Sequence, residues 1–348
     1  MKQSGIGRFV AVLGTAVMVA AACGGTPAAS SAPSGSSGAS ASTSAVTQPT
    51  RPVEFIISTA PGGGSDIYAR FWQGIIEKNH FSPQPVQPVN KEGGSGAVAF
   101  TYVYQKTGDM HEIMVTLNSF FTTIITQKLP YKATDFTPIA NMALDPFFLW
   151  VNDDSPWKTA KDFVDAAKAN SLVVAGTGSK QEDEALFDRI ADTMQTKAFT
   201  FVPQTSGSTV AAALAGHQGG VVATVNNPSE GLGLYTANPK KIRPLCAFLP
   251  DSPKSGTYQG LATCKSQGIP IDDYYIVRMI VGAPGLTPAQ QAFWVDVFKK
   301  VYDSADWQKF MTDNALQPDF RTGVELRQLI SQYQQLHQDI ATKFKWVQ

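Results

Sequence analysis

Six short segments rich in glycine, serine, threonine and asparagine have the composition of an anion-binding site. They are residues 61–66, 93–96, 118–119, 176–179, 205–208 and 226–227. Backbone N–H groups at a helix N-terminus favour an anion, and hydroxyl and amide side chains add neutral donors. Ordinary helix caps use the same residue types, so the recurrence of the segments carries more weight than any one of them. Together they predict a site that holds an anion without requiring arginine.

The same segments carry no recognisable catalytic pattern. The sequence contains no GxSxG elbow and no HExxH motif, and residues 61–66 match neither a dinucleotide fingerprint nor a phosphate-binding loop. Asp66 could act as a general base, which leaves an exported α/β hydrolase or lyase as an alternative, although a helix cap is its simpler role. The sequence therefore favours binding without catalysis, and it predicts neither a cofactor nor a metal.

Strand-like and helix-like runs alternate from Arg51 onward. Residues 53–57 form an apolar run, and Ile67, Phe71 and Ile75 follow at the four-residue spacing of a helix. This alternation predicts an α/β fold with mainly parallel sheets flanked by helices. In open sheets of this kind ligands bind beyond the carboxyl ends of the strands, where the six segments lie.

The N-terminus has the pattern of a secretion signal. Lys2 and Arg8 precede an apolar stretch that is too short to span a bilayer, and residues 20–24 resemble a bacterial lipoprotein signal in which Cys23 becomes acylated. Plain secretion is the alternative. We predict a signal peptide at 1–22 and a lipid-anchored, flexible tether at 23–50, which places the protein outside the cytoplasm as a cell-surface or periplasmic lipoprotein.

Charge and cysteine content narrow the class of protein further. The 28 basic and 28 acidic residues balance, so nothing indicates a nucleic-acid partner. Cys246 and Cys264 are the cysteines that remain after Cys23, and in an exported protein they predict a disulfide, with two unrelated buried thiols as the alternative. Their spacing is not that of a metal site.

The polar segments, in their order and spacing, resemble those of the Bug-type extracytoplasmic receptors of tripartite tricarboxylate transporters. The similar segments are residues 61–66, 90–96, 176–179, 201–207, 214–218, 241–245 and 282–288. The resemblance covers roughly residues 53–344. It implies a two-lobed, periplasmic-binding-protein-like fold (a Venus flytrap), and a monomer that closes on a small organic carboxylate. Its partners would be the membrane subunits of a transporter, or alternatively a sensor system to which it presents its ligand.

The resemblance also implies where the ligand lies, between residues 60–66 of one lobe and residues 177–179 of the other. With the neighbouring polar turns, the predicted ligand-binding residues are Ala60, Pro61, Gly62, Gly63, Gly64, Ser65, Asp66, Ser95, Asn118, Ser119, Thr177, Gly178, Ser179, Ser206 and Asn226. The sequence departs from the family pattern at Gln204, Glu184 and residues 91–92. These departures bear on the identity of the distal half of the ligand. We expect residues 51–153 and 276–348 to form the first lobe, and residues 154–275 the second.

Overall fold

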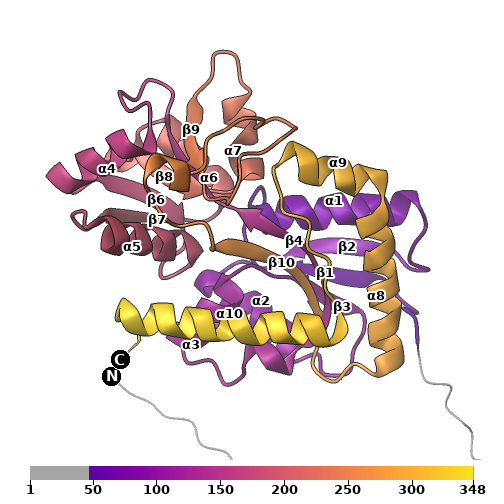
Figure 1. Cartoon of the computed structure of the whole chain (residues 1–348). Coiled ribbons are helices and arrows are strands. Elements are labelled where there is room, and N and C mark those ends of the chain that lie inside the picture. The colour runs from indigo at the N-terminus through magenta and orange to yellow at the C-terminus, as the bar shows by residue number, and fades with distance from the viewer. Residues whose placement is uncertain (1–46, 348) are drawn as a thin grey trace, which may run out of the picture. The chain divides into compact units, whose positions relative to one another are not determined.

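Two five-stranded sheets, each covered by helices, organise the protein in the computed structural model (Figure 1). The structure describes residues 47–347, so the predicted signal peptide, Cys23 and nearly all of the predicted tether lie outside it. None of the helices within that range is long and apolar enough to cross a bilayer.

The two sheets have the same topology. The first has the order β2-β1-β3-β10-β4 and the second the order β7-β6-β8-β5-β9. In each sheet one strand, β10 or β5, runs antiparallel to its two neighbours, and the other four strands share one direction. The strands are β1 (Val53–Ile57), β2 (Val86–Asn90), β3 (Glu112–Val115), β4 (Thr137–Pro146), β5 (Phe148–Asn152), β6 (Val173–Thr177), β7 (Thr200–Gln204), β8 (Ala223–Asn226), β9 (Ile242–Ala247) and β10 (Tyr275–Gly282). The predicted α/β fold is confirmed, and its sheets are mixed.

Helices connect the strands and cover both sheets. The first sheet carries α1 (Gly64–Lys78), α2 (Ala97–Tyr104), α3 (Ser119–Thr126), α8 (Pro288–Asp303), α9 (Ala305–Asp313) and α10 (Gly323–Lys343). The second carries α4 (Ala160–Ala169), α5 (Glu182–Met194), α6 (Gly207–Ala215) and α7 (Pro228–Tyr235). Short 3-10 turns are η1 (Gly94–Gly96), η2 (Ala133–Asp135), η3 (Gln218–Gly220) and η4 (Lys265–Gln267). The sequence has capping-box patterns at residues 159–162 and 287–290, and both capping boxes form, before α4 and α8.

The boundary between the lobes differs from the expected one. Strand β5 pairs with β8 and β9, so it belongs to the second sheet, whereas the sequence analysis placed residues up to 153 in the first lobe. The chain crosses between the sheets at Phe147 and again where β10 begins at Tyr275. Every residue of β5 is buried, and such a strand does not reveal from its own sequence which sheet it joins.

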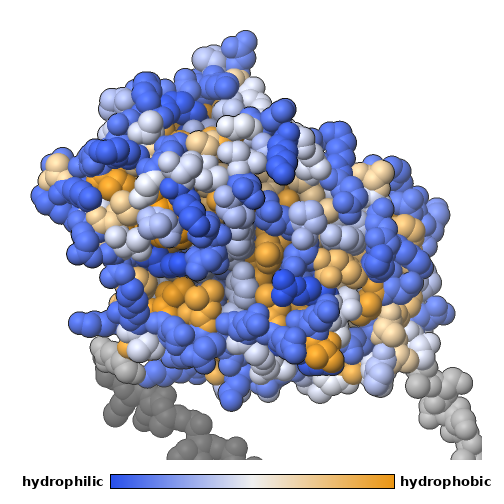
Figure 2. Space-filling model, in the orientation of Figure 1, coloured by the Kyte–Doolittle hydropathy of each residue, from blue (hydrophilic) through white to orange (hydrophobic). Residues whose placement is uncertain are grey.

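Helix α10 contacts both lobes, although the whole C-terminal segment was assigned to the first. Along its length α10 packs on α3 and β4. At its end, Lys343 forms an ion pair with Asp192 of α5, and Lys180 donates a hydrogen bond to the carbonyl oxygen of Trp346. In Figure 1 this helix runs along the first lobe and reaches the side of the second. Figure 2 shows a mostly hydrophilic exterior, with hydrophobic residues gathered between the second lobe and α10.

The predicted disulfide between Cys246 and Cys264 is formed, with an S–S distance of 2.04 Å. Both cysteines are fully buried beside Phe147 and Leu149 in a core of the second lobe. The disulfide fixes the chain after β9 to the edge of the second sheet, where Ala247 also forms a β-bridge with Thr263.

The buried His337 should make stability depend on pH. Its Nδ1 donates to the carbonyl oxygen of Tyr333 and its Nε2 accepts from the Tyr274 hydroxyl, so the ring is neutral. Burial lowers its pKa from 6.5 to about 4. Below pH 6.5 only the unfolded state takes up this proton, so stability is lost as the pH falls from 6.5 towards 4.

We expect His337→Gln to remove this part of the pH dependence. Between pH 7 and pH 5 the parent should lose about 2 kcal/mol of unfolding free energy that the variant keeps. Urea denaturation at the two pH values measures the difference. His80→Gln, at an exposed turn position, is the control and should change the pH dependence little. An equal loss in the parent and in His337→Gln would contradict the assignment.

Candidate functional site

A pocket of about 430 Å³ lies between loops of the two lobes. Four of its lining residues were predicted, namely Ser95, Ser119, Thr177 and Gly178. Glu92 and Gln204 also line it, at positions that the family resemblance linked to the distal half of the ligand, whereas Ser58, Thr59 and Gln181 were not predicted. Gln181 spans the two lobes, because its side-chain amide donates to the carbonyl oxygen of Ser95 at 3.2 Å. Ser58 and Thr59 follow the end of β1 directly, and that position was their only sequence signal.

A second, smaller pocket of about 10 Å³ shares Thr59 and Thr177 with the first. It is also lined by the predicted residues Gly64 and Ser65. Its volume corresponds to roughly one water-sized group. The hydroxyls of Thr59 and Ser65 are buried there and have no hydrogen-bond partner in the described structure. The two pockets therefore form one site with a wide part and a narrow part.

Asp66 holds the first glycine loop together. Its carboxylate accepts hydrogen bonds from the backbone N–H of Gly62 at 3.0 Å, from Arg70 at 2.8 Å and from the Asn90 amide at 3.0 Å. Both carboxylate oxygens are thus engaged within the first lobe, and Asp66 lines neither pocket. Asp66 therefore supports the loop, but it is not the predicted helix cap, because the cap position of α1 is Gly63.

The rest of the first loop, Ala60, Pro61, Gly62 and Gly63, lines neither pocket. A side chain added at Gly62 would come within 3.0 Å of the Ser208 hydroxyl, and Gly62 has a φ of +81°, which favours glycine. A side chain added at Gly63 would meet Ser206 of the second lobe, so the two glycines permit the close approach of the lobes.

Three other predicted residues also support loops and line neither pocket. Asn118 bonds to the backbone of Tyr275 and Val277 in β10, and Ser206 caps α6 through the N–H of Thr209. The Asn226 amide donates to the carbonyl oxygen of Gly207.

Ser179 is exposed, and its hydroxyl donates to Glu184. The prediction that Ser179 binds the ligand therefore finds no support in its position.

Acidic side chains already occupy two of the N–H groups that were expected to bind the ligand. Glu230 accepts from the N–H of Gly64 at 2.5 Å, and Asp183 accepts from the N–H of Thr177 at 2.6 Å. Burial raises the pKa of Glu182 and of Glu230 to about 7, and it also raises the pKa of Asp183. The site thus contains acidic groups, whereas the composition of its loops had suggested a purely neutral site.

A buried arginine stands beside these acids. Arg278 of β10 donates to Asp145 through Nε at 2.9 Å and Nη2 at 2.6 Å, and Nη2 also donates to Asn227 of the second lobe. The hydroxyl of Tyr68 donates to the same oxygen of Asp145. Arg278 and Asp145 are 1% and 0% exposed. The sequence signal was a single arginine within the apolar run of β10, and the sequence analysis did not use it.

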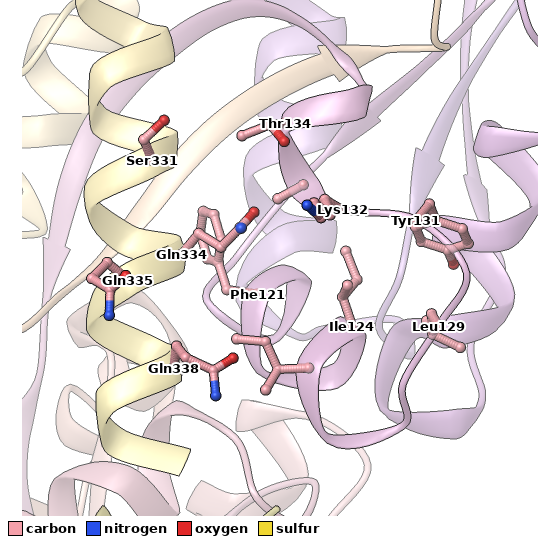
Figure 3. Close-up of a pocket in the computed structure, with 12 residues that line it drawn as sticks. Phe121, Ile124, Leu129, Tyr131, Lys132, Thr134, Ser331, Gln334, Gln335 and Gln338 are labelled. Carbon is pink, nitrogen blue, oxygen red and sulfur yellow. The ribbon is translucent and has the colours of Figure 1, made fainter. Parts of the chain in front are cut away.

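A third pocket, of about 320 Å³, lies within the first lobe between α3 and α10 (Figure 3). There Gln334, Gln335 and Gln338 of α10 lie opposite Phe121 and Ile124 of α3. All of its lining residues fall within 121–134 and 331–338, so the second lobe contributes none. Across residues 47–347 no cluster of histidine, cysteine and acidic residues is arranged to hold a metal ion.

Two solved structures with bound ligands share this fold. MatC from Rhodopseudomonas palustris with bound malate has a TM-score of 0.73 at 20% identity, over 84% of this chain and 99% of that one. A second R. palustris protein, solved with adipate, has a TM-score of 0.72 at 20% identity over 84% and 97%. The periplasmic binding protein BugD has a TM-score of 0.71 at 17% identity over 84% and 98%. These likenesses show the two-lobed periplasmic-binding-protein-like fold.

Sequence comparisons identify the family. A UPF0065 protein from the gbd 5′ region of Cupriavidus necator is 24% identical over 82% of this chain and 84% of its own length. A UPF0065 protein of Bordetella pertussis is 31% identical over 36% of this chain and 38% of its own length. Residues 75–344 match the tripartite tricarboxylate transporter family receptor, TctC. This match spans most of the chain and confirms the resemblance seen in the polar segments, so the chain belongs to the TctC receptor family, a family of binding proteins and not of enzymes.

Proposed function

We propose that this protein captures a small organic carboxylate between its two lobes and delivers it to the membrane subunits of a tripartite tricarboxylate-type transporter. The observation that carries the proposal is the interlobe pocket with its three buried hydroxyls, those of Ser58, Thr59 and Ser65, which lack partners in the described structure. A buried hydroxyl without a partner costs about 1–3 kcal/mol, so a ligand oxygen that accepts from it gains affinity. The malate and adipate in the two R. palustris structures support a carboxylate ligand.

We further propose that the chain is exported and held at the membrane through an acylated Cys23, and that the two crossings near Phe147 and Tyr275 act as the hinge. The support for the anchor is the sequence pattern of residues 20–24 together with the uncharged segment that follows. The hinge is supported by the connections at the two crossings. Each leads directly into β5 or β10, the strand that runs antiparallel to its neighbours in the sheet that the chain enters. In this arrangement the tether leaves the two lobes free to close on a solute.

Calorimetric titration with succinate, malate and adipate tests the ligand class. We expect saturable binding of at least one of them, with one ligand per chain. Thr59→Val should weaken that binding by about 1–3 kcal/mol, because a buried donor to the ligand is lost. Thr193→Val, at an exposed position of α5, is the matched control and should bind like the parent.

The two failures are separable. If Thr59→Val binds like the parent, the ligand does not use this hydroxyl and the proposed location of the site is wrong. The absence of binding by all three acids would remove the support for a small aliphatic carboxylate.

A further inference from the structure

Three carboxylates from the second lobe surround the narrow pocket. Glu182 and Asp183 come from the start of α5, and Glu230 comes from α7. Glu182 is 1% exposed and Asp183 is 3% exposed. The Glu230 carboxyl group lies against Gly207, where an added Cβ would approach its Cδ to 2.0 Å. Glu182 and Asp183 are therefore packed into the protein, and Glu230 is partly exposed but has its carboxyl group packed against Gly207.

The positive charge around the narrow pocket does not neutralise these acids. Among the described residues that line it, Arg278 is the only cationic one, and its hydrogen bonds go to Asp145 and Asn227. The positive charge of Arg278 is balanced by the negative charge of Asp145. Three carboxylates are then left without an ion-pair partner, which is an expensive arrangement in a buried site.

The narrow pocket also contains polar atoms that lack partners. One oxygen of Glu182, Oε2, is buried and accepts no hydrogen bond in the described structure. The hydroxyls of Ser65 and Thr59 are likewise buried and have no hydrogen-bond partner there. Ser65 is 0% exposed and lies at the start of α1, on the lobe opposite Glu182. A group bound here would thus face unpaired acceptors from both lobes.

We propose that the narrow pocket is a subsite for a primary ammonium group, so that the ligand is an amino-substituted carboxylate. This inference rests on the proposed function and narrows its ligand class. An ammonium group has three donors and about the size of the water-sized space available. Its partners would be Glu182, Glu230 and the Ser65 hydroxyl, while the ligand carboxylate lies in the wide pocket that begins at Thr59 and Thr177. Once these acids are ionised, they would repel a second carboxylate in the narrow pocket.

When no ligand is bound, protonation is the other way to neutralise these acids. Burial raises the pKa of Glu182 and of Glu230 to about 7, against the favourable field of Arg278. The other charged groups that face them are Asp183 and Asp145, and both oppose ionisation. An ammonium ion favours the ionised acids, so its binding at pH 7 should release protons, and binding should tighten as the pH rises through 7.

The test compares ligands that differ only in an amino group. Aspartate is paired with succinate and glutamate with glutarate, in titration calorimetry at pH 8. We expect the amino member of at least one pair to bind about tenfold more tightly or better, the effect of a charge-assisted hydrogen bond. At pH 7 its binding heat should change between buffers of different ionisation enthalpy, as proton release requires.

Glu182→Gln should reduce the amino preference to near one, while binding of the amino-free partner is kept or improved. Glu230→Gln should act in the same direction and serves as an independent variant, with circular dichroism to verify that each is folded. The exposed Glu325→Gln is the matched control and should keep the preference.

If succinate and glutarate each bind as tightly as their amino partners in the parent, the ammonium subsite is wrong and the proposed carboxylate function stands. An amino preference that survives both Glu182→Gln and Glu230→Gln would also overturn the subsite. If none of the four acids binds, the proposed function fails for ligands of this size and the subsite fails with it.

Discussion

Replacing Arg278 with methionine is expected to lower the free energy of unfolding by about 3–5 kcal/mol, the usual cost of removing one partner of a buried ion pair. The guanidinium donates two hydrogen bonds to Asp145 and one to Asn227, and it lies 4.5 Å from the centre of the Tyr68 ring. Methionine fills a similar volume but leaves the Asp145 carboxylate buried without its cation. The loss is therefore electrostatic and not the result of a cavity.

Chemical denaturation of the parent and of Arg278→Met measures this loss. The matched control is Arg327→Met on α10, where the arginine is exposed and forms no ion pair in the described structure, and it should stay within about 0.5 kcal/mol of the parent. Asp145→Asn should also destabilise the protein, because it leaves the arginine unpaired. A change below 1 kcal/mol in Arg278→Met would show that Asp145 is protonated or otherwise compensated.

The Arg278 network also joins the lobes. Asp145 lies on β4 and Arg278 on β10, both in the first sheet, whereas Asn227 follows β8 of the second. The hydroxyl of Tyr68 on α1 also lies 3.3 Å from the Ser229 hydroxyl of α7. The network sits where the chain crosses into β10, so its loss should affect the contact between the lobes as well as the core of the first.

Removing the disulfide is the second change with a large expected effect. The double variant Cys246→Ala, Cys264→Ala should lose about 3 kcal/mol of unfolding free energy on the chain-entropy model, given the sequence separation of 18 residues. The bond restricts the unfolded chain, and in the folded state it holds Cys264, next to the bridge between Thr263 and Ala247, at the edge strand β9. Urea denaturation under oxidising conditions measures the difference.

A reductant provides the control for the disulfide. The parent treated with dithiothreitol under denaturing conditions should unfold at nearly the urea concentration of the double variant, and the reductant should not change the variant itself. If the oxidised parent and the double variant unfold at the same urea concentration, the disulfide contributes nothing to stability.

Local sequence patterns determined the units of this fold. The run at 53–57, followed by glycines and by apolar residues four apart, predicted β1, the first loop and α1, and all three are present. The capping boxes before α4 and α8 formed as expected. Such features depend on the periodicity and caps of neighbouring residues, so a single sequence contains the information they need. The two cysteines, in a chain that its N-terminal pattern predicts to be exported, likewise predicted the disulfide.

Only the tertiary structure decided which residues of the polar segments face the site. Asn118 and Ser179 have the residue types of ligand donors, yet one bonds to β10 and the other is exposed. A turn residue can point into a cleft, along its own loop or into solvent, and the packing of the opposite lobe selects among these. The sequence pattern of a single loop contains no information about that choice.

Long-range pairing decided the charges of the site and the sheet to which β5 belongs. Glu230 reaches the N–H of Gly64 across 166 residues of sequence, and Arg278 reaches Asp145 across 133. β5 joined the second sheet by pairing with β8 and β9. Both partners come much later in the chain, so the sequence around β5 does not reveal this choice. The sequence by itself thus determined the main strands and helices, the family and the edge of each sheet where the proposed site lies. Tertiary packing placed three acids and one arginine there, because only folding brings together groups so far apart in sequence.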